Sequence, residues 1–293
     1  MSEPGSLFKD RYNMKVIQTV EEFRGELEHI DRPLGLVPTM GFLHAGHLAV
    51  VRQARVDSST LAASIFVNPA QFGPQEDYSV YPRDMEGDLR KLDISGVDLV
   101  LMPSVKEMYP EGFDTHVCVG KASSKLEGAA RPGHFRGVAT VVAKLLSISR
   151  PEKAYFGQKD AQQALVVKRI NADLNLGAEI VVVPTSRDVD GLAFSSRNAY
   201  LSSDERKAAT VLFRSLQLAR DMWNCGNTDA KRIVDEMRAL IDREPLARVD
   251  YISVTDTDAL EEVVQVDRTS MVLLAVYIGK IRLIDNISIG ADE

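Results

Sequence analysis

The stretch Pro38-Thr39-Met40-Gly41-Phe42-Leu43-His44-Ala45-Gly46-His47 determines how the rest of the chain is interpreted. It follows the apolar run 33–37, which predicts a buried parallel strand, and it precedes residues 48–55, whose apolar spacing predicts a helix. Two histidines therefore lie where a strand ends and a helix begins. Unpaired N–H groups at a helix start attract phosphate, and glycines let a ligand approach the backbone. The stretch predicts an anion-binding turn.

Two other interpretations of this turn stay open on the residues alone. One is a tight turn with two surface histidines, although two of the chain's 5 His fall here. The other is a zinc site, but His-x-x-His without nearby cysteine or carboxylate ligands fits zinc poorly.

Neutral amides follow the next predicted strand, the apolar run 59–67. Ligands bind beyond the carboxyl ends of strands in an open α/β sheet. Asn68 and Gln71 lie at such a position, and their donors and acceptors suit a ligand with hydroxyls or a carboxylate. The alternative is that these amides cap a loop.

Two later segments carry cations. After the predicted strand 153–156 come Gly157, Gln158, Lys159 and Asp160, of which Lys159 suits a phosphate and Asp160 a ribose. Within residues 193–198, two hydroxyls stand beside Arg197, and an arginine binds phosphate through two donors at once. The alternatives are a helix cap with a solvated lysine, and a turn with an exposed arginine.

The order of the predicted elements indicates an α/β fold with a parallel sheet, followed by a smaller α+β domain. Residues 1–13 are expected to be a disordered extension, 14–184 the larger domain and 185–293 the smaller one. Ser202 and Glu205 predict a capping box that opens one long helix to Trp223. A second helix, 229–241, and strands at 248–255, 270–278 and 281–287 are expected after it.

Composition excludes several classes of protein. The net charge of the 293 residues is −7, without a sustained basic stripe, so nucleic acid is not expected as the main partner. The 2 Cys are far apart in the sequence, which favours a reducing cytoplasm. The first residues lack an apolar signal-peptide core, and the longest apolar run, 271–278, is too short to cross a membrane.

The chain resembles the pantoate–β-alanine ligase family, within the superfamily of nucleotidyltransferases that carry an HxGH signature. The resemblance runs from about Met14 onward and rests on six blocks in the family's order. These are PTMGFLHAGH (38–47), FVNPAQF (66–72), EGAARPGHFRGVATVV (127–142), YFGQKDAQQ (155–163), DGLAFSSRNAYL (190–201) and GKIRLIDNI (279–287).

The resemblance implies an N-terminal Rossmann-like domain, a smaller C-terminal lid and a homodimer. It implies that pantoate is adenylated by ATP, with release of pyrophosphate, and that β-alanine then displaces AMP to give pantothenate, a precursor of coenzyme A. Mg²⁺ is the expected metal, carried mainly by the ATP phosphates.

By motif, the resemblance implies four catalytic residues: His44, His47, Lys159 and Arg197. ATP is expected at Met40, Gly41, Phe42, Leu43, His44, Ala45, Gly46, His47, Gly157, Gln158, Lys159, Asp160, Ser186, Phe194, Ser195, Ser196 and Arg197. Pantoate and β-alanine are expected at Met40, Asn68, Gln71 and Gln163. Glu127, Arg131 and His134 lie in the segment that is expected to form a flexible wall of the site.

Four positions depart from the commoner family pattern without removing an expected catalytic group: Ala45, Gln158, Ser186 and Phe194. Two other functions remain as alternatives. A related nucleotidyltransferase acting on a phosphorylated substrate would want further cations where this chain has amides. A nucleotide-binding regulatory module would lack Lys159 or Arg197, and this chain has both.

Overall fold

The computed structural model describes residues 11–74 and 76–290. The chain divides into two compact units: one comprises the residues up to Gly157 together with Gln162–Val183, and the other comprises Gln158–Ala161 and the residues from Pro184 onward. Most of the predicted extension, residues 1–10, lies outside the described residues. Of its last residues, Asn13 donates its backbone N–H to Asp93 at 2.8 Å.

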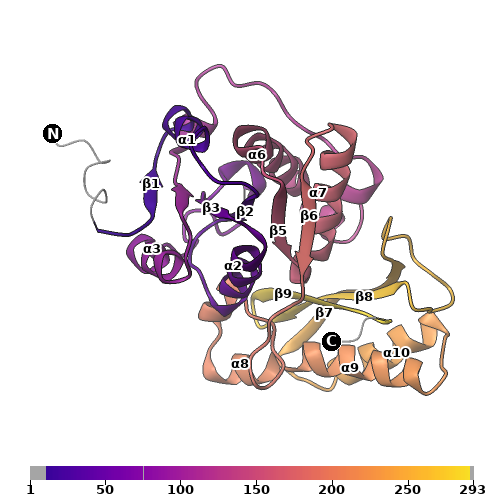
Figure 1. Cartoon of the computed structure of the whole chain (residues 1–293). Coiled ribbons are helices and arrows are strands. Elements are labelled where there is room, and N and C mark those ends of the chain that lie inside the picture. Colours follow the sequence, from indigo (N-terminus) through magenta and orange to yellow (C-terminus); the bar gives the residue numbers. More distant parts are fainter. Residues whose placement is uncertain (1–10, 75, 291–293) are drawn as a thin grey trace. The chain divides into compact units, whose positions relative to one another are not determined.

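The first unit is built on a six-stranded sheet in the order β1-β4-β3-β2-β5-β6, and every neighbouring pair is parallel (Figure 1). The strands are β1 (Lys15–Ile17), β2 (Leu34–Thr39), β3 (Thr60–Ile65), β4 (Leu99–Leu101), β5 (Lys153–Gly157) and β6 (Glu179–Val183). The predicted α/β fold with a parallel sheet is confirmed.

Helices cover both faces of this sheet, as a parallel sheet requires. On one face pack α1 (Val20–Leu27), α6 (His134–Ser149) and α7 (Ala161–Asp173); on the other pack α2 (Ala45–Asp57) and α3 (Met85–Ile94). Successive side chains of β2 point to opposite faces of the sheet. Leu36 is buried in the core under α1, α6 and α7, and Val37 is buried in the core under α2 and α3. Shorter helical turns are η2 (Pro69–Gln71), α4 (Val105–Met108), η3 (Lys121–Ser123) and α5 (Glu127–Ala130).

The topology of the sheet marks one strand end as a ligand position. From β2 the chain continues to β3 on one side and later to β5 on the other side, so the strand order reverses at β2. Ligands of open parallel sheets bind beyond the carboxyl ends of the strands at such a reversal. The histidine turn directly follows β2.

The second unit contains a three-stranded antiparallel sheet in the order β7-β8-β9 (Figure 1). Two amphipathic helices, α9 (Val211–Asn224) and α10 (Ala230–Ile241), share one apolar core with this sheet. Its other elements are η4 (Gln158–Asp160), η5 (Ser196–Tyr200), α8 (Ser203–Ala208), β7 (Ala247–Asp256), β8 (Ser270–Ile278) and β9 (Ile281–Ser288). In the described part of the chain, no helix is both long and apolar enough to cross a membrane.

The single long helix predicted from Ser202 to Trp223 is wrong. The predicted capping box is present, but α8 ends at Ala208 and α9 begins at Val211. At the break, both the N–H and the hydroxyl of Thr210 bond to the carbonyl of Lys207, at 3.2 and 2.8 Å. A threonine side chain that bonds to nearby backbone competes with the helical pattern, and this explains the interruption.

Candidate active site

The histidine turn is a tight loop between β2 and α2. Gly41 has φ +80° and Phe42 has φ 51°, so two successive residues adopt left-handed conformations. Glycine adopts that conformation readily, whereas at Phe42 it needs support from surrounding structure.

Helix α3 supplies that support through Asp88. One carboxylate oxygen of Asp88 accepts the N–H of Phe42 at 2.6 Å and the other accepts the N–H of Leu43 at 2.7 Å. One helical turn later, Lys91 donates to the carbonyl of Leu43 at 2.8 Å. Burial raises the pKa of Asp88, while these N–H groups and Lys91 oppose that shift. The sequence interpretation assigned no role to Asp88.

The two histidines stand side by side at the start of α2. Their ring centroids are 4.0 Å apart, and the backbone N–H of His44 donates to Nδ1 of His47 at 3.3 Å. A ring nitrogen that accepts a hydrogen bond carries no proton, so neutral His47 holds its proton on Nε2. That N–H is a donor of the kind that binds a phosphate oxygen.

The amides after β3 form a second polar cluster at the same end of the sheet. Gln71 donates to the sulfur of Met40 at 2.9 Å and accepts from Asn68 at 3.1 Å. Asn68 also donates to the carbonyl of Gly137 at 3.1 Å and accepts from Ala70 N–H at 3.1 Å and from the Tyr109 hydroxyl at 2.8 Å. Asn68 is only 1% exposed and its amide is fully engaged, so it holds Gln71 in place.

The segment from Glu127 to Arg136, which was expected to form a flexible wall of the site, contains α5 and the first turn of α6. The buried Gln162 holds α5: its amide donates to the carbonyls of Ala122 and Lys125, and it accepts the N–H of Glu127 at 3.0 Å. Its neighbour Gln163, the expected pantoate ligand, is only half-buried.

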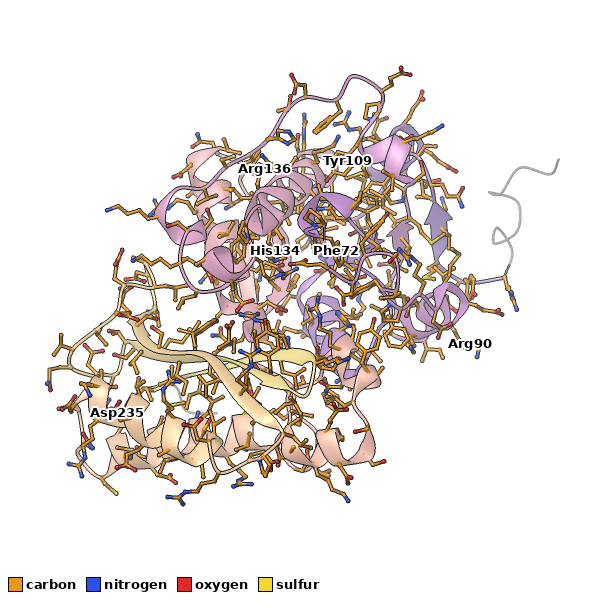
Figure 2. All side chains as sticks on the ribbon, turned by 180° about the vertical axis from the view of Figure 1, so that it is seen from behind. Phe72, Arg90, Tyr109, His134, Arg136 and Asp235 are labelled. Carbon is orange, nitrogen blue, oxygen red and sulfur yellow. The ribbon has the colours of Figure 1, made fainter. Side chains whose placement is uncertain are left out.

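A chain of polar contacts links this segment to the amide cluster. Arg131 forms a two-point ion pair with Glu76, at 2.8 and 2.7 Å, and contacts Nε2 of His134 at 3.1 Å. Nδ1 of His134 lies 2.8 Å from the carbonyl of Gln71; His134 is labelled in Figure 2. Only a protonated Nδ1 can bond to a carbonyl, so Nε2 accepts from Arg131 and the ring is neutral.

The environment of His134 favours that neutral form. Burial and the neighbouring Arg131 lower its pKa to about 4, against opposing effects of the Gln71 carbonyl, Glu76 and Glu127. Both effects disfavour a second positive charge.

The remaining predicted residues belong to the second unit. Lys159 lies 3.6 Å from Asp160 in η4. Residues 186–194 form a hairpin-like loop in which Phe194 N–H donates to the Ser186 carbonyl at 3.1 Å. Ser195 caps η5 by accepting the N–H of Arg197 at 3.3 Å. The structure thus joins Ser186 and Phe194, eight positions apart, through their backbones.

Within residues 11–74 and 76–290, no three or more His, Cys, Asp or Glu side chains are grouped to hold a metal ion. A Mg²⁺ ion that arrives on a nucleotide needs no such group, because it keeps water and phosphate oxygens as ligands.

Comparisons with known proteins identify relatives along almost the whole chain. The sequence profile of the family described as pantoate-beta-alanine ligase matches residues 15–288. A pantothenate synthetase from Roseiflexus castenholzii is 54% identical over 273 residues, which are 93% of this chain and 98% of that protein.

Solved structures agree with the sequence matches. A pantothenate synthetase from Thermus thermophilus superimposes with a TM-score of 0.91 at 45% identity, covering 95% of this chain and 100% of that one. A pantoate-beta-alanine ligase from Francisella tularensis, complexed with beta-gamma ATP and beta-alanine, gives a TM-score of 0.78 at 32% identity. That match covers 95% of this chain and 99% of the other.

Proposed function

The chain belongs to the pantoate–β-alanine ligase family, and on that premise we propose that it condenses pantoate with β-alanine through a pantoyl-adenylate, releasing AMP and pyrophosphate. The observation that carries the proposal is the pairing, on adjacent strands β2 and β3, of a histidine turn suited to phosphate with an amide cluster suited to a hydroxy acid. Such a pair would bring a carboxylate substrate together with a nucleoside triphosphate.

In the first step the pantoate carboxylate attacks the α-phosphorus of ATP. A carboxylate is ionised at neutral pH, so this attack needs no general base. It needs alignment and neutralisation of the phosphate charge. We assign these tasks to His44 and His47, the backbone N–H groups in the first turn of α2, Lys159 and Arg197. Mg²⁺, carried by the phosphates, adds positive charge when it is bound.

The other nucleotide contacts follow the family motifs. We propose that ATP also meets Gly157, Gln158, Asp160 and Ser186, and the loop Phe194–Arg197. At Gly157 a β-carbon would contact only Val50, at 4.0 Å, so packing within the protein does not require glycine there. Close approach of a ligand explains the glycine.

Pantoate is assigned to Gln71 and Gln163, with Met40 beside them. For Asn68 we propose a positioning role through Gln71 in place of the direct contact expected from the sequence, because its amide groups are already engaged within the protein. Gln71 is held from three directions, by Asn68, Met40 and His134.

In the second step β-alanine displaces AMP. No separate pocket for this small zwitterion is evident in the sequence motifs, so we propose that it enters the space that pyrophosphate leaves, where phosphate-binding cations hold its carboxylate. The adenylate is prone to hydrolysis, and segment 113–136 would serve to exclude water from it.

Three further proposals rest on the resemblance. Residues 14–184 bind ATP and pantoate, residues 185–293 act as a lid, and two copies form a homodimer. The reaction is assigned to the cytoplasm, where the expected free thiols are stable.

The test is an assay of pyrophosphate with ATP, Mg²⁺, pantoate and β-alanine, omitting each in turn. The proposal predicts pantothenate, AMP and pyrophosphate in equal amounts, and none of them without pantoate. His47→Ala should stay folded and lose most of the activity. A protein that consumes ATP equally well with a phosphorylated acceptor and without pantoate would contradict the assignment.

A further inference from the structure

Strand β9 carries a buried pair, Asp285-Asn286, within the block 279–287 to which the proposed reaction assigns no role. The two residues are each 3% exposed. Buried polar groups are costly unless they are hydrogen-bonded, so the partners of this pair indicate what it does.

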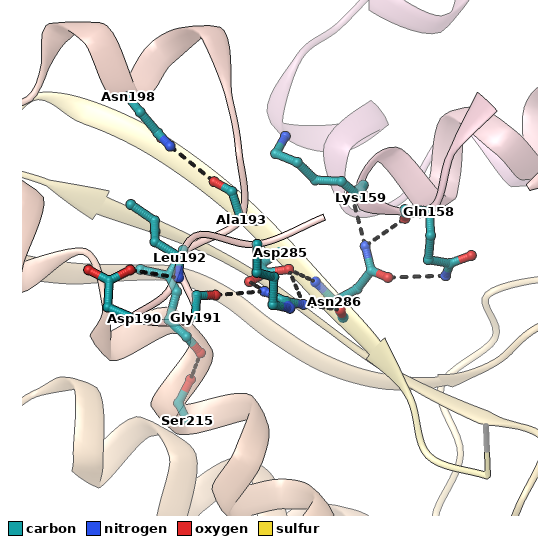
Figure 3. A network of polar contacts seen from close by, with 12 residues as sticks. Gln158, Lys159, Asp190, Gly191, Leu192, Ala193, Asn198, Ser215, Asp285 and Asn286 are labelled. Atoms are coloured by element: carbon teal, nitrogen blue, oxygen red, sulfur yellow. Dashed lines mark hydrogen bonds and ion pairs between the residues drawn. The ribbon is translucent and has the colours of Figure 1, made fainter. Parts of the chain in front are cut away.

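The side chain of Asn286 is bonded to the segment that carries Lys159. Its amide donates to the carbonyls of Gln158 and Lys159 at 3.0 and 2.8 Å, and its oxygen accepts from the Gln158 amide at 3.1 Å (Figure 3). Both amide protons are therefore used on two successive carbonyls of one short turn. This arrangement fixes the backbone from which the Lys159 side chain extends.

Asp285 is bonded to the hairpin that carries Ser186 and Phe194. Its carboxylate accepts two hydrogen bonds from the Arg187 guanidinium, at 2.6 and 3.0 Å. The same guanidinium donates to the carbonyls of Gly191 and Asn286 and lies 4.5 Å from the ring centroid of Phe213. Arg187 itself pairs with Ala193 across the hairpin.

We propose that Asp285 and Asn286 are positioning residues that hold two nucleotide-binding segments, 158–160 and 186–197, on one strand of the second unit. The inference rests on the proposed function, which assigns these segments to ATP. It also explains the division of the chain: residues 158–161 belong to the second unit although the residues on either side of them belong to the first.

Cationic side chains that are already held in place bind a charged ligand better than mobile ones, because they lose less conformational entropy when the ligand binds. Loss of the Asn286 amide frees the backbone at Lys159 without removing any group that touches the substrate. The expected signature is weaker ATP binding with little change in the affinity for pantoate.

The test is Asn286→Ala, with Asn171→Ala as the matched control. Asn171 also bonds backbone through its side chain, donating to the Ala178 carbonyl at 2.8 Å and accepting its N–H at 3.2 Å, but it belongs to the first unit, and these bonds involve neither segment. The dissociation constant for ATP is measured by calorimetry, KM for ATP and for pantoate by pyrophosphate release, and folding by thermal unfolding.

Asn286→Ala should raise the dissociation constant and KM for ATP about 10-fold, from the loss of about two hydrogen bonds, and change KM for pantoate less than about twofold. Asn171→Ala should lose thermal stability only. An Asn286→Ala protein that folds and binds ATP as the wild type does would overturn the inference.

Arg187→Lys keeps the test decisive if Asn286→Ala does not fold. Lysine keeps the positive charge beside Asp285 but cannot make the two-point bond to that carboxylate together with the bonds to the Gly191 and Asn286 carbonyls, and ATP affinity should fall about threefold. Unchanged affinity would contradict the inference. If the wild type binds ATP but releases no pyrophosphate with pantoate, the proposed function is refuted and the inference is not. Calorimetry of ATP binding to the wild type and the variants still tests whether the two segments are held in place.

Discussion

At the scale of single residues, Asp88 determines the shape of the histidine turn from 46 positions away in the sequence. We predict that Asp88→Asn lowers kcat/KM by about 10- to 100-fold, because one of two backbone N–H groups then faces an amide N–H in place of a carboxylate oxygen; hydrogen bonds to charged groups contribute about 1.5–3 kcal/mol. Steady-state kinetics measure the change.

Asp93→Asn is the matched control for that variant. Asp93 lies on the same helix and also accepts two backbone N–H groups, those of Asn13 and Met14 at 2.8 and 3.2 Å, but these are outside the turn. Equal losses of activity in the two variants would show that Asp88 acts only through the stability of α3.

His134 gives a prediction of pH dependence. Its pKa in the folded protein is about 4, below the ordinary value of 6.5, so between these pH values the unfolded state binds more protons. The stabilisation that arises from keeping His134 neutral is fully present above pH 6.5 and is lost as the pH falls towards 4. Between pH 6.5 and 4.5 this one group removes about 2 kcal/mol of unfolding free energy.

Urea unfolding at several pH values from 7 to 4.5 measures that loss. The free energy of unfolding of His134→Gln should fall by about 2 kcal/mol less than that of the wild type between pH 6.5 and 4.5, since glutamine does not titrate. If both proteins lose stability in parallel, His134 is protonated in the folded state and the proposed tautomer is wrong.

The residues that form recognisable strings could be found from the sequence, whereas Asp88, which holds the histidine turn, could not. His44, His47 and Gln71 follow predicted strands and could be identified in that way. Asp88 looks like an ordinary acidic residue in the first turn of a helix, and its partners Phe42 and Leu43 become neighbours only when the helix packs on the sheet. No local pattern in the sequence signals such a contact.

At the scale of elements, α6 is placed against η2 by Gly137. A β-carbon on Gly137 would lie 2.2 Å from the carbonyl oxygen of Ala70 and 2.5 Å from the nitrogen of Gln71. We predict that Gly137→Ala displaces the amide cluster and raises KM for pantoate about 10-fold or more, because the obstacle is backbone and cannot rotate away.

Gly25→Ala is the control, since a β-carbon there meets nothing within 4 Å in α1. Alanine is the better helix former, so this variant should keep its activity and gain up to about 1 kcal/mol of stability. A Gly137→Ala enzyme with normal KM for pantoate would show that η2 does not set the position of Gln71.

The order of the helices and strands could be predicted from the sequence better than the residues at which they begin and end. Apolar runs predicted β2, β3 and β5, because buried parallel strands are nearly continuous stretches of apolar residues. The break between α8 and α9 escaped prediction, since amphipathic spacing continues through it and only the bonding of Thr210 interrupts the helix. The first turn of α6 includes His134, whose contact with the Gln71 carbonyl no local sequence pattern indicates.

At the scale of the whole molecule, the parallel sheet of the first unit explains why distant motifs cooperate. Parallel strands place their carboxyl ends at one edge, so residues after β2 and β3 meet there whatever their separation in the sequence. The contact of Met40 with Gln71 is the direct evidence. The motif order predicted this meeting, but not the hydrogen bonds through which it occurs.

The central claim is that pantoate and ATP react before β-alanine takes part. Its most direct test is exchange of labelled pyrophosphate into ATP by the enzyme with Mg²⁺ and pantoate alone. The account predicts exchange that depends on pantoate and continues without β-alanine, and transfer of ¹⁸O from the pantoate carboxylate into AMP once β-alanine is added. Exchange that strictly requires β-alanine would contradict the account and indicate a concerted reaction or a different activated species.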